Sequence, residues 1–278
     1  MSTGRHALFA LLVACSSKTQ APAPSAPCLP GEISSTGTGI AAVDGISAHV
    51  CWGERCLTLD RDGKATGAAD HPATEVARHA AADALTTDVR LGDTAVVTVC
   101  NRGGRGTCVE LPVPATLATE SRATAASASL KRLAVFFKDR VDTWDLKAKA
   151  VVASYPTTAE VREAHFVGDT RLLARGSGGE AWVLHDLVAG ATVTVGEPGW
   201  DTSVIDGTTA VVFHGSQIAV VSAVAMSAGR PFTLPGRVAM ATAWFDRVLV
   251  VLDHPAGTAQ IDPSTGSIYA GPALPICK

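Results

Sequence analysis

Four aspartates recur along the chain at positions where acidic side chains could do chemistry. Each stands in a short turn just before an apolar run, and they are Asp93, Asp169, Asp206 and Asp246. Carboxylates that meet from several repeats can coordinate a metal ion or hold a cofactor. A carboxylate in a tight turn can equally accept hydrogen bonds from its own backbone, and that role also predicts one acid per repeat. The recurrence favours turn caps, with a metal or cofactor site at a channel mouth as the alternative.

Four other segments resemble functional motifs, but each lacks a defining residue. They are an RGG-like segment (Asn101–Thr107), the start of a calcium loop (Asp60–Gly63), a glycine-rich run (Gly176–Gly179) and a Ser–His pair (His214–Ser216). A calcium loop from Asp60 would need Gly and Glu where the chain has Ala65 and His71. The chain has neither a GxxxxGK[ST] phosphate loop nor a GxSxG nucleophile elbow. We predict polar turns at all four segments, and we assign no catalytic residue, metal ligand or cofactor.

The turns that carry the aspartates belong to a longer repeat. Six similar openings each lead into an apolar strand, a polar hairpin tip, a second strand that ends near an acid or Leu, and a last strand. Four strands about every 40 residues, with no helical period between them, are typical of propeller blades. The sequence predicts an all-β chain with one β-propeller of six four-stranded blades over residues 31–277. Seven blades would result if residues 74–86 hide strands or if the termini share a blade.

Two segments resemble repeats of known propellers. Residues 141–151, VDTWDLKAKAV, resemble a blade segment of the WD40 family, and residues 261–270, IDPSTGSIYA, resemble the repeat of quinoprotein-type propellers. Both resemblances imply the propeller fold. A pair of β-sandwiches is the competing fold, but the regular spacing argues against it. We predict that Trp144 and Trp182 pack between blades and that Trp200, beside Gly199 in a loop, is the best candidate for an exposed binding rim.

The first fifteen residues predict export. Arg5 precedes a short apolar run from Ala7 to Ala14, which is too short to span a bilayer. The following Leu-Val-Ala-Cys resembles the lipobox of bacterial lipoproteins. That resemblance implies a signal peptide over residues 1–14 and acyl chains such as palmitate on Cys15, whereas an ordinary signal peptide with a nearby Cys is the alternative. Residues 15–30 are then a lipid anchor and a Pro-rich linker, and Ser16 favours the outer membrane by resemblance to enteric lipoproteins.

If Cys15 carries the lipid, six of the seven cysteines remain, and an even number can pair completely in disulfides. This agrees with an oxidising compartment. A two-residue hairpin turn at Gly53–Glu54 would set two of them opposite each other. We predict the pairs Cys51–Cys56, Cys100–Cys108 and, across the ends of the domain, Cys28–Cys277. A metal or redox site is the alternative, but the chain has no CxxC motif and its His residues show no ligand spacing.

The predicted function follows from the predicted cellular location and the predicted fold. A net charge of −3 gives no basic excess for nucleic-acid binding. A propeller displays many loops on a rigid disc, so we predict a lipid-anchored, non-enzymatic scaffold that binds an unidentified envelope protein or complex. At the level of the fold, the chain is similar to propeller proteins of the barrel-assembly and Tol systems. The alternative is a lactonase-like or quinoprotein-like propeller enzyme, and a surface protein without a defined ligand is a third reading.

Overall fold

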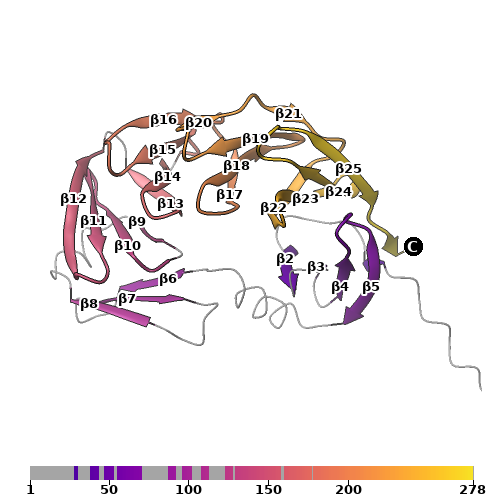
Figure 1. Cartoon of the computed structure of the whole chain (residues 1–278), viewed down its shortest axis with the longest axis horizontal. Coiled ribbons are helices and arrows are strands. Elements are labelled where there is room, and N and C mark those ends of the chain that lie inside the picture. Colours follow the sequence, from indigo (N-terminus) through magenta and orange to yellow (C-terminus); the bar gives the residue numbers. More distant parts are fainter. Residues whose placement is uncertain are drawn as a thin grey trace, which may run out of the picture.

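We analysed a computed structural model of the chain. It describes residues 28–30, 38–43, 47–52, 55–70, 87–91, 96–101, 108–112, 123–127, 129–157, 160–176 and 178–277. All but the first and last of the described strands form six antiparallel sheets that follow one another around a ring in chain order (Figure 1). The first strand of each sheet lies nearest the centre of the ring and the last lies at its rim. This arrangement is a β-propeller with six blades, as predicted.

The first three blades hold the N-terminal half. Blade 1 contains β2 (Thr38–Val43), β3 (Ser47–Trp52), β4 (Arg55–Leu59) and β5 (Ala65–Asp70). Blade 2 contains β6 (Thr87–Leu91), β7 (Val96–Asn101) and β8 (Cys108–Pro112). Blade 3 contains β9 (Ala123–Ala126), β10 (Arg132–Phe136), β11 (Arg140–Asp145) and β12 (Ala150–Pro156). Residues 74–86, which could have added strands, lie outside the described residues.

The other three blades are described almost completely. Blade 4 contains β13 (Val161–Val167), β14 (Arg171–Gly176), β15 (Trp182–Asp186) and β16 (Thr192–Val195). Blade 5 contains β17 (Asp201–Val204), β18 (Thr209–His214), β19 (Gln217–Ser222) and the short β20 (Ser227–Ala228) and β21 (Phe232–Thr233), which both pair with β19. Blade 6 contains β22 (Val238–Trp244), β23 (Arg247–Asp253), β24 (Ala256–Ile261) and β25 (Ile268–Ala273). No helix long and apolar enough to cross a membrane occurs among the residues that the structure places.

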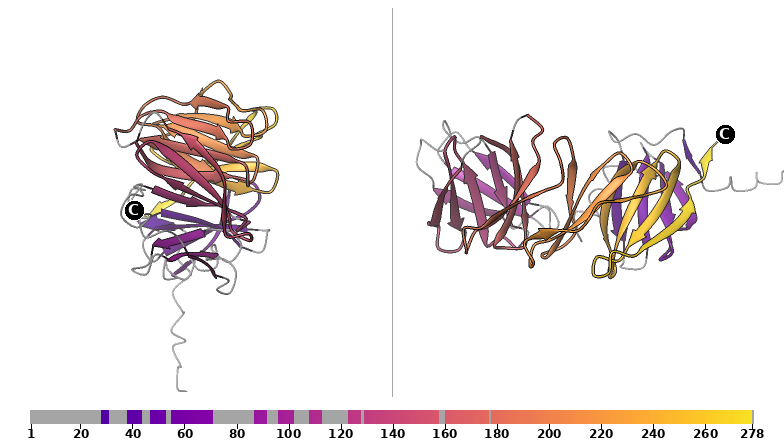
Figure 2. Two further views of the ribbon diagram at one scale, coloured as in Figure 1. Left: turned by 90° about the vertical axis from the view of Figure 1, so that its left-hand side faces the viewer. Right: turned by 90° about the horizontal axis from the view of Figure 1, so that it is seen from above.

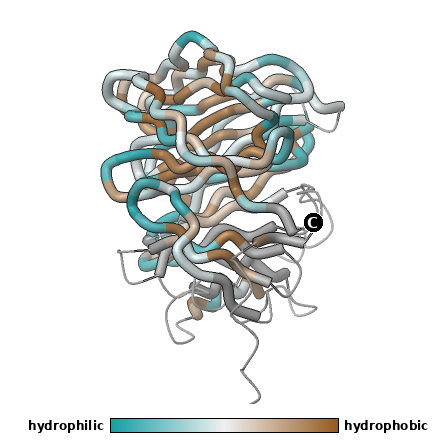
Figure 3. Tube along the Cα trace, turned by 90° about the vertical axis from the view of Figure 1, so that its right-hand side faces the viewer, coloured by the Kyte–Doolittle hydropathy of each residue, from teal (hydrophilic) through white to brown (hydrophobic). Residues whose placement is uncertain are grey.

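The blades pack face against face, which explains why second strands such as β10 have a continuous apolar run. In β10, Leu133 and Val135 face the core shared with blade 2, whereas Ala134 and Phe136 face the core shared with blade 4. Figure 2 shows the sheets from two sides, and Figure 3 shows hydrophobic residues within the sheets and hydrophilic residues at the turns. A strand buried on both faces has no polar side to alternate with, so it reads as an unbroken apolar run.

Blade 6 closes the ring against blade 1. A shared core contains Val50 and Leu57 from blade 1 and Trp244 and Val251 from blade 6. The strands β1 (Leu29–Pro30) and β26 (Ile276–Cys277) also pair in parallel, which brings the two ends of the domain together. No blade exchanges strands between the two ends of the chain in the described part, so closure depends on packing between blades and on the β1–β26 pair.

The cysteine positions suit the predicted disulfides. Cys28, Cys56 and Cys108 each form a disulfide bond. The strand register sets Cys51 opposite Cys56 and Cys100 opposite Cys108, and it sets Pro30, not Cys28, opposite Cys277. The three pairings remain predictions for peptide mapping. Residues 1–27, with the predicted signal peptide, Cys15 and most of the linker, lie outside the described residues.

Candidate functional site

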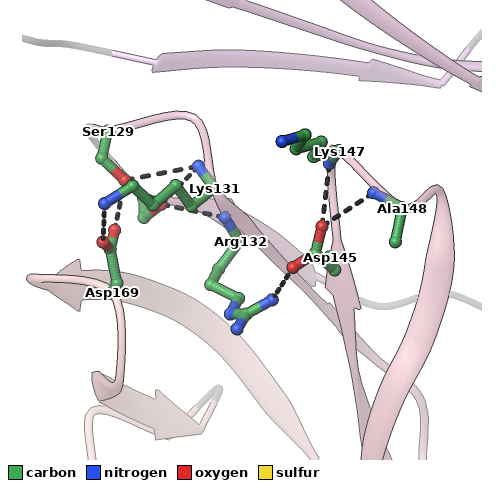
Figure 4. A network of polar contacts seen from close by, with 8 residues as sticks. Ser129, Lys131, Arg132, Asp145, Lys147, Ala148 and Asp169 are labelled. Atoms are coloured by element: carbon green, nitrogen blue, oxygen red, sulfur yellow. Dashed lines mark hydrogen bonds and ion pairs between the residues drawn. The ribbon is translucent and has the colours of Figure 1, made fainter.

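The recurrent aspartates do not converge on one site in the described part of the chain. The Asp206 carboxylate accepts hydrogen bonds from the backbone N–H groups of Thr208 and Thr209, at 2.6 and 2.8 Å, so it caps its own turn. Asp169 accepts a hydrogen bond from the Ser129 hydroxyl and lies 3.3 Å from Lys131 Nζ, both in the preceding blade (Figure 4). No group of three His, Cys, Asp or Glu among the described residues could hold a metal ion. Asp93 lies outside these residues.

Another set of aspartates caps the turns between the third and fourth strands. Asp145 Oδ1 accepts hydrogen bonds from the backbone N–H groups of Lys147 and Ala148, at 2.9 and 2.8 Å, as Figure 4 shows. These backbone bonds, led by that of Ala148, hold the pKa of Asp145 below its usual value. Hydrogen bonds from Ser264 lower the pKa of Asp262 to about 2. These acids are ionised structural caps, which is the role that the sequence favoured for the recurrent acids.

The motif-like segments are turns wherever the structure describes them. Gly178 and Gly179 lie between β14 and β15, and Gly215 and Ser216 lie between β18 and β19. Residues 60–63 begin the turn from β4 to β5, where Gly63 has a φ of +78°. The prediction of polar turns is confirmed for these three segments. Of residues 101–107, only Asn101 is described.

The predictions for two of the three tryptophans are confirmed, and the third is wrong. Trp144 and Trp182 are buried, as predicted, and the prediction of a rim position for Trp200 is wrong because Trp200 is only 3 % exposed. Gly199, at a φ of +82°, forms the turn before it, and the Trp200 ring belongs to the core between blades 4 and 5. The Trp200 carbonyl accepts hydrogen bonds from Trp182 Nε1 and from Arg175 Nη1, at 2.9 and 2.7 Å.

A group of charged residues lies on and beside the inner strand of blade 4. Arg175 donates from Nε to Glu163 at 2.8 Å and stacks over the Trp182 ring at 4.5 Å. His165 Nε2 lies 3.1 Å from Glu163. Burial raises the pKa of Glu163, but the hydrogen bonds from His165 and Arg175 outweigh it, so the net pKa is lowered. A carboxylate held ionised by an arginine is a weak base, and the group braces β13 and β14 against the loop before β17.

Phe245, unlike the charged group of blade 4, does not brace one strand against another. It forms, with Asp246, the turn between β22 and β23, and its φ is +54°. A bulky residue at positive φ is an outlier, because its side chain crowds the backbone. Half of Phe245 is nevertheless exposed to solvent. The strain, on the order of 1–3 kcal/mol, therefore displays an aromatic ring instead of burying it.

Two neighbours hold the Phe245 ring at the junction of blades 6 and 1. The Trp244 ring contacts it edge-on, with centroids 4.7 Å apart and planes at 71°. Arg61, from the turn after β4, places its guanidinium 4.9 Å from the Phe245 ring centroid. The Arg61 carbonyl in turn accepts hydrogen bonds from Trp244 Nε1 and Gln260 Nε2, at 3.1 and 2.8 Å. The closure of the ring and the position of Phe245 therefore depend on the same contacts.

A pocket of about 290 Å³ opens beside this ring. Its lining, which we call the Phe245 site, consists of Arg61, Asp62, Trp244, Phe245, Asp246, Arg247 and Gln260. Exposed aromatic and arginine side chains are the residue types that contribute most to protein–protein binding. The site contains Asp246 of the predicted acids, but the sequence pattern did not indicate Phe245. The one feature that points to position 245 is the corresponding position of blade 4. There Gly168, directly after the first strand β13, also has a positive φ.

Other non-glycine residues at positive φ gain more burial. Leu130, at +56°, packs against the core between blades 2 and 3, and Met226, at +50°, packs against the core between blades 4 and 5. Apolar burial of this kind offsets backbone strain at about 25 cal/mol per Å². Lys149, at +54°, is exposed but polar. Among these four residues, Phe245 alone exposes a large apolar side chain.

Comparisons with known proteins support the fold. No family model and no curated protein matches this chain. PorZ of Porphyromonas gingivalis, a bacterial surface component of the type-IX secretion system, is similar with a TM-score of 0.51 and 9% identity, over 89% of this chain and 39% of PorZ. The WD40 domain of Neurospora crassa Pan2 has a TM-score of 0.43 and 15% identity, over 85% of this chain and 79% of that domain. At 9% identity, the likeness to PorZ shows a shared fold and no shared function.

Proposed function

We propose that this chain is a lipid-anchored protein of a bacterial envelope, whose propeller binds another envelope protein and catalyses no reaction. The proposed localisation rests on residues 1–15, with Cys15 as the residue that carries the lipid at the outer membrane. The Pro-rich linker then holds the propeller away from the lipid surface, because such segments are extended and semi-rigid. Membrane contact comes from the lipid, and nucleic acid is not a partner.

The observation that carries the binding role is the exposed Phe245 ring. Backbone strain at a functional site persists when the surrounding structure holds the residue in place. Trp244 and Arg61 do this at the junction of blades 6 and 1. A rigid aromatic side chain loses little conformational entropy on binding, which makes it an effective anchor in a partner's pocket. The aspartates that the enzyme alternative required have structural contacts at Asp169 and Asp206.

The test compares the full-length, lipidated protein with its Phe245→Gly variant in cells. Mild crosslinking and affinity capture are followed by identification of the envelope proteins that come with it. We expect the variant to lose its principal partner at least about tenfold, since truncation of a central anchor costs about 2 kcal/mol or more. Leu130→Gly is the matched control, because Leu130 has the same backbone conformation in another blade. Equal capture by wild type and Phe245→Gly would refute the role of this site.

A further inference from the structure

The outer strand of blade 3 differs from those of the other blades. β12 spans 7 residues, contains no charged side chain, and leaves Val151 and Val152 exposed at 46% and 51%. Its pairing with β11 shifts register at Val152, and its last residue is Pro156. It is the outermost described strand of its sheet. Exposed edge strands can pair with other chains, so proteins usually shorten them or interrupt them with charges or Pro.

The outer strands of other blades carry such protection. β16 has 4 residues and β20 has 2 residues. β25 contains Pro272, which has no backbone N–H, and β5 ends at Asp70. Before Pro156, β12 offers residues 150–155 with neither a charge nor a Pro, which is the longest such run among the outer strands of blades 1, 3, 4, 5 and 6.

A groove of about 470 Å³ runs between β12 and the adjacent face of blade 4. Its apolar lining includes Tyr155 of β12 and Val183 and Leu187 of blade 4. The Tyr155 hydroxyl donates a hydrogen bond to the Leu187 carbonyl, which fixes the two walls relative to each other. A groove of this size is already formed and can accept side chains from a bound segment.

Two polar groups on the groove lack protein partners among the described residues. Thr157 Oγ1 is buried without a hydrogen bond. No described residue bonds to the His185 ring, which lines the groove, and burial lowers the pKa of this imidazole. A neutral imidazole has one donor and one acceptor, and a hydroxyl can do both. The partly buried His185 ring matches the N–H or C=O group that an extended main chain presents, whereas Thr157 Oγ1 is closed off from solvent.

We propose that β12 and this groove bind an extended peptide segment of a partner protein, added as a further strand at the edge of blade 3. A small molecule could fill the groove, but only an extended chain can also satisfy the backbone groups along β12. Lys147 and Lys149 precede β12 and form no ion pair with a described residue, so they favour a peptide with an acidic residue at that end. This inference rests on the proposed function, because it assumes a protein partner.

The test uses a displayed library of random peptides of about seven residues, the length that could pair along β12. The library is selected on the detergent-solubilised full-length protein and on two variants. Val152→Lys places a charge on the exposed edge, whereas Val188→Lys is a matched control at a 75% exposed turn residue of blade 4. We expect peptides with alternating apolar residues and a terminal acid. Their affinity falls at least about tenfold with Val152→Lys and not with Val188→Lys, and Pro substitution at alternate peptide positions abolishes binding.

Several outcomes would overturn the proposal. Selected peptides that bind Val152→Lys as well as wild type would show that the edge is not used, and so would a selection that enriches nothing. Concentration-dependent dimerisation of the full-length protein that Val152→Lys abolishes would assign the edge to a second copy of this chain. Failure here leaves the Phe245 crosslinking result unaffected, because the two sites lie on different blades.

Discussion

The junction between blades 4 and 5 and the junction between blades 6 and 1 use similar contacts but join different parts of the chain. The first joins blades that follow each other in the chain. Its core is apolar around Trp182 and Trp200, and Trp182 and Arg175 of blade 4 both donate to the Trp200 carbonyl before blade 5. The second joins the two ends of the domain, and its core is supplemented by side chains of blade 6 that bond to backbone carbonyls of blade 1. Gln260 and Trp244 both donate to the Arg61 carbonyl.

Both junctions have a Trp N–H and a second side chain bonded to one backbone carbonyl, so what differs is whether the chain connects the two blades. Consecutive blades stay close because the chain connects them, whereas the ends of the chain must find each other and bear the entropy of closing a long loop. The contacts that close the ring also position Arg61 under Phe245. We infer that the closing junction serves both stability and display, whereas the junction of blades 4 and 5 serves stability alone.

The largest expected effect on stability comes from removing the buried tryptophan at each junction. Trp182→Ala and Trp244→Ala should each lower the free energy of unfolding by about 3–5 kcal/mol, since both remove a buried aromatic ring. Hydrogen exchange should distinguish them. Trp244→Ala should increase exchange in blade 1, and Trp182→Ala should increase it in blades 4 and 5. The same exchange pattern in both variants would contradict the separate roles.

The next effect is a difference in pH dependence. Burial lowers the pKa of His185 in blade 4. The unfolded chain therefore binds this proton more readily, so stability is full above about pH 6.5 and falls as the pH drops below it. Turn aspartates such as Asp262, with a pKa of about 2, have the same sign of effect at lower pH, where stability falls from about pH 4 downward.

Denaturation curves measured from pH 7 to pH 3 should show both ranges. The His185→Gln variant should lose the fall near pH 6.5 and keep the fall near pH 4. An unchanged upper range in that variant would show that His185 is not its source.

A smaller effect is expected at the closing junction from Gln260→Ala. The variant loses the hydrogen bond to the Arg61 carbonyl and the one that Gln260 accepts from Arg247 at 3.0 Å. Loss of a buried hydrogen bond costs about 1 kcal/mol, so chemical denaturation should show a decrease of about 1–2 kcal/mol. Thr202→Ala, which removes one side-chain bond to the Val211 carbonyl within blade 5, is the comparison. A larger loss from Thr202→Ala would contradict the special role of the closing junction.

The smallest effect on stability is expected for Phe245→Gly. Glycine accepts a positive φ without strain, and this gain offsets the lost contacts with Trp244 and Arg61 and the greater freedom of the unfolded chain. We expect a change within about 1 kcal/mol. Leu130→Gly should destabilise more, because it also removes packing against a core. A loss of several kcal/mol from Phe245→Gly would show that the ring is there for stability.

The sequence predicted the repeated parts of this molecule and missed the exceptions. Apolar runs such as residues 133–137 indicated the strands of the repeated blades, and the recurrent acids indicated turn caps. Trp200 was misplaced because the sequence does not show which way a loop side chain turns after Gly199. Phe245 gave no signal beyond Gly168 at the corresponding position of blade 4, because a positive φ at a bulky residue is imposed by its surroundings. The groove beside β12 arises from the spacing of two blades.

The most direct test of the proposed binding role places a photo-reactive aromatic amino acid at position 245 of the full-length, lipidated protein in cells. The same amino acid at position 188, a more exposed turn residue of blade 4, is the control. We predict that position 245 crosslinks to a defined envelope protein and that position 188 does not. Equal crosslinking from both positions, or none from position 245 in a folded and correctly localised protein, would contradict the proposal.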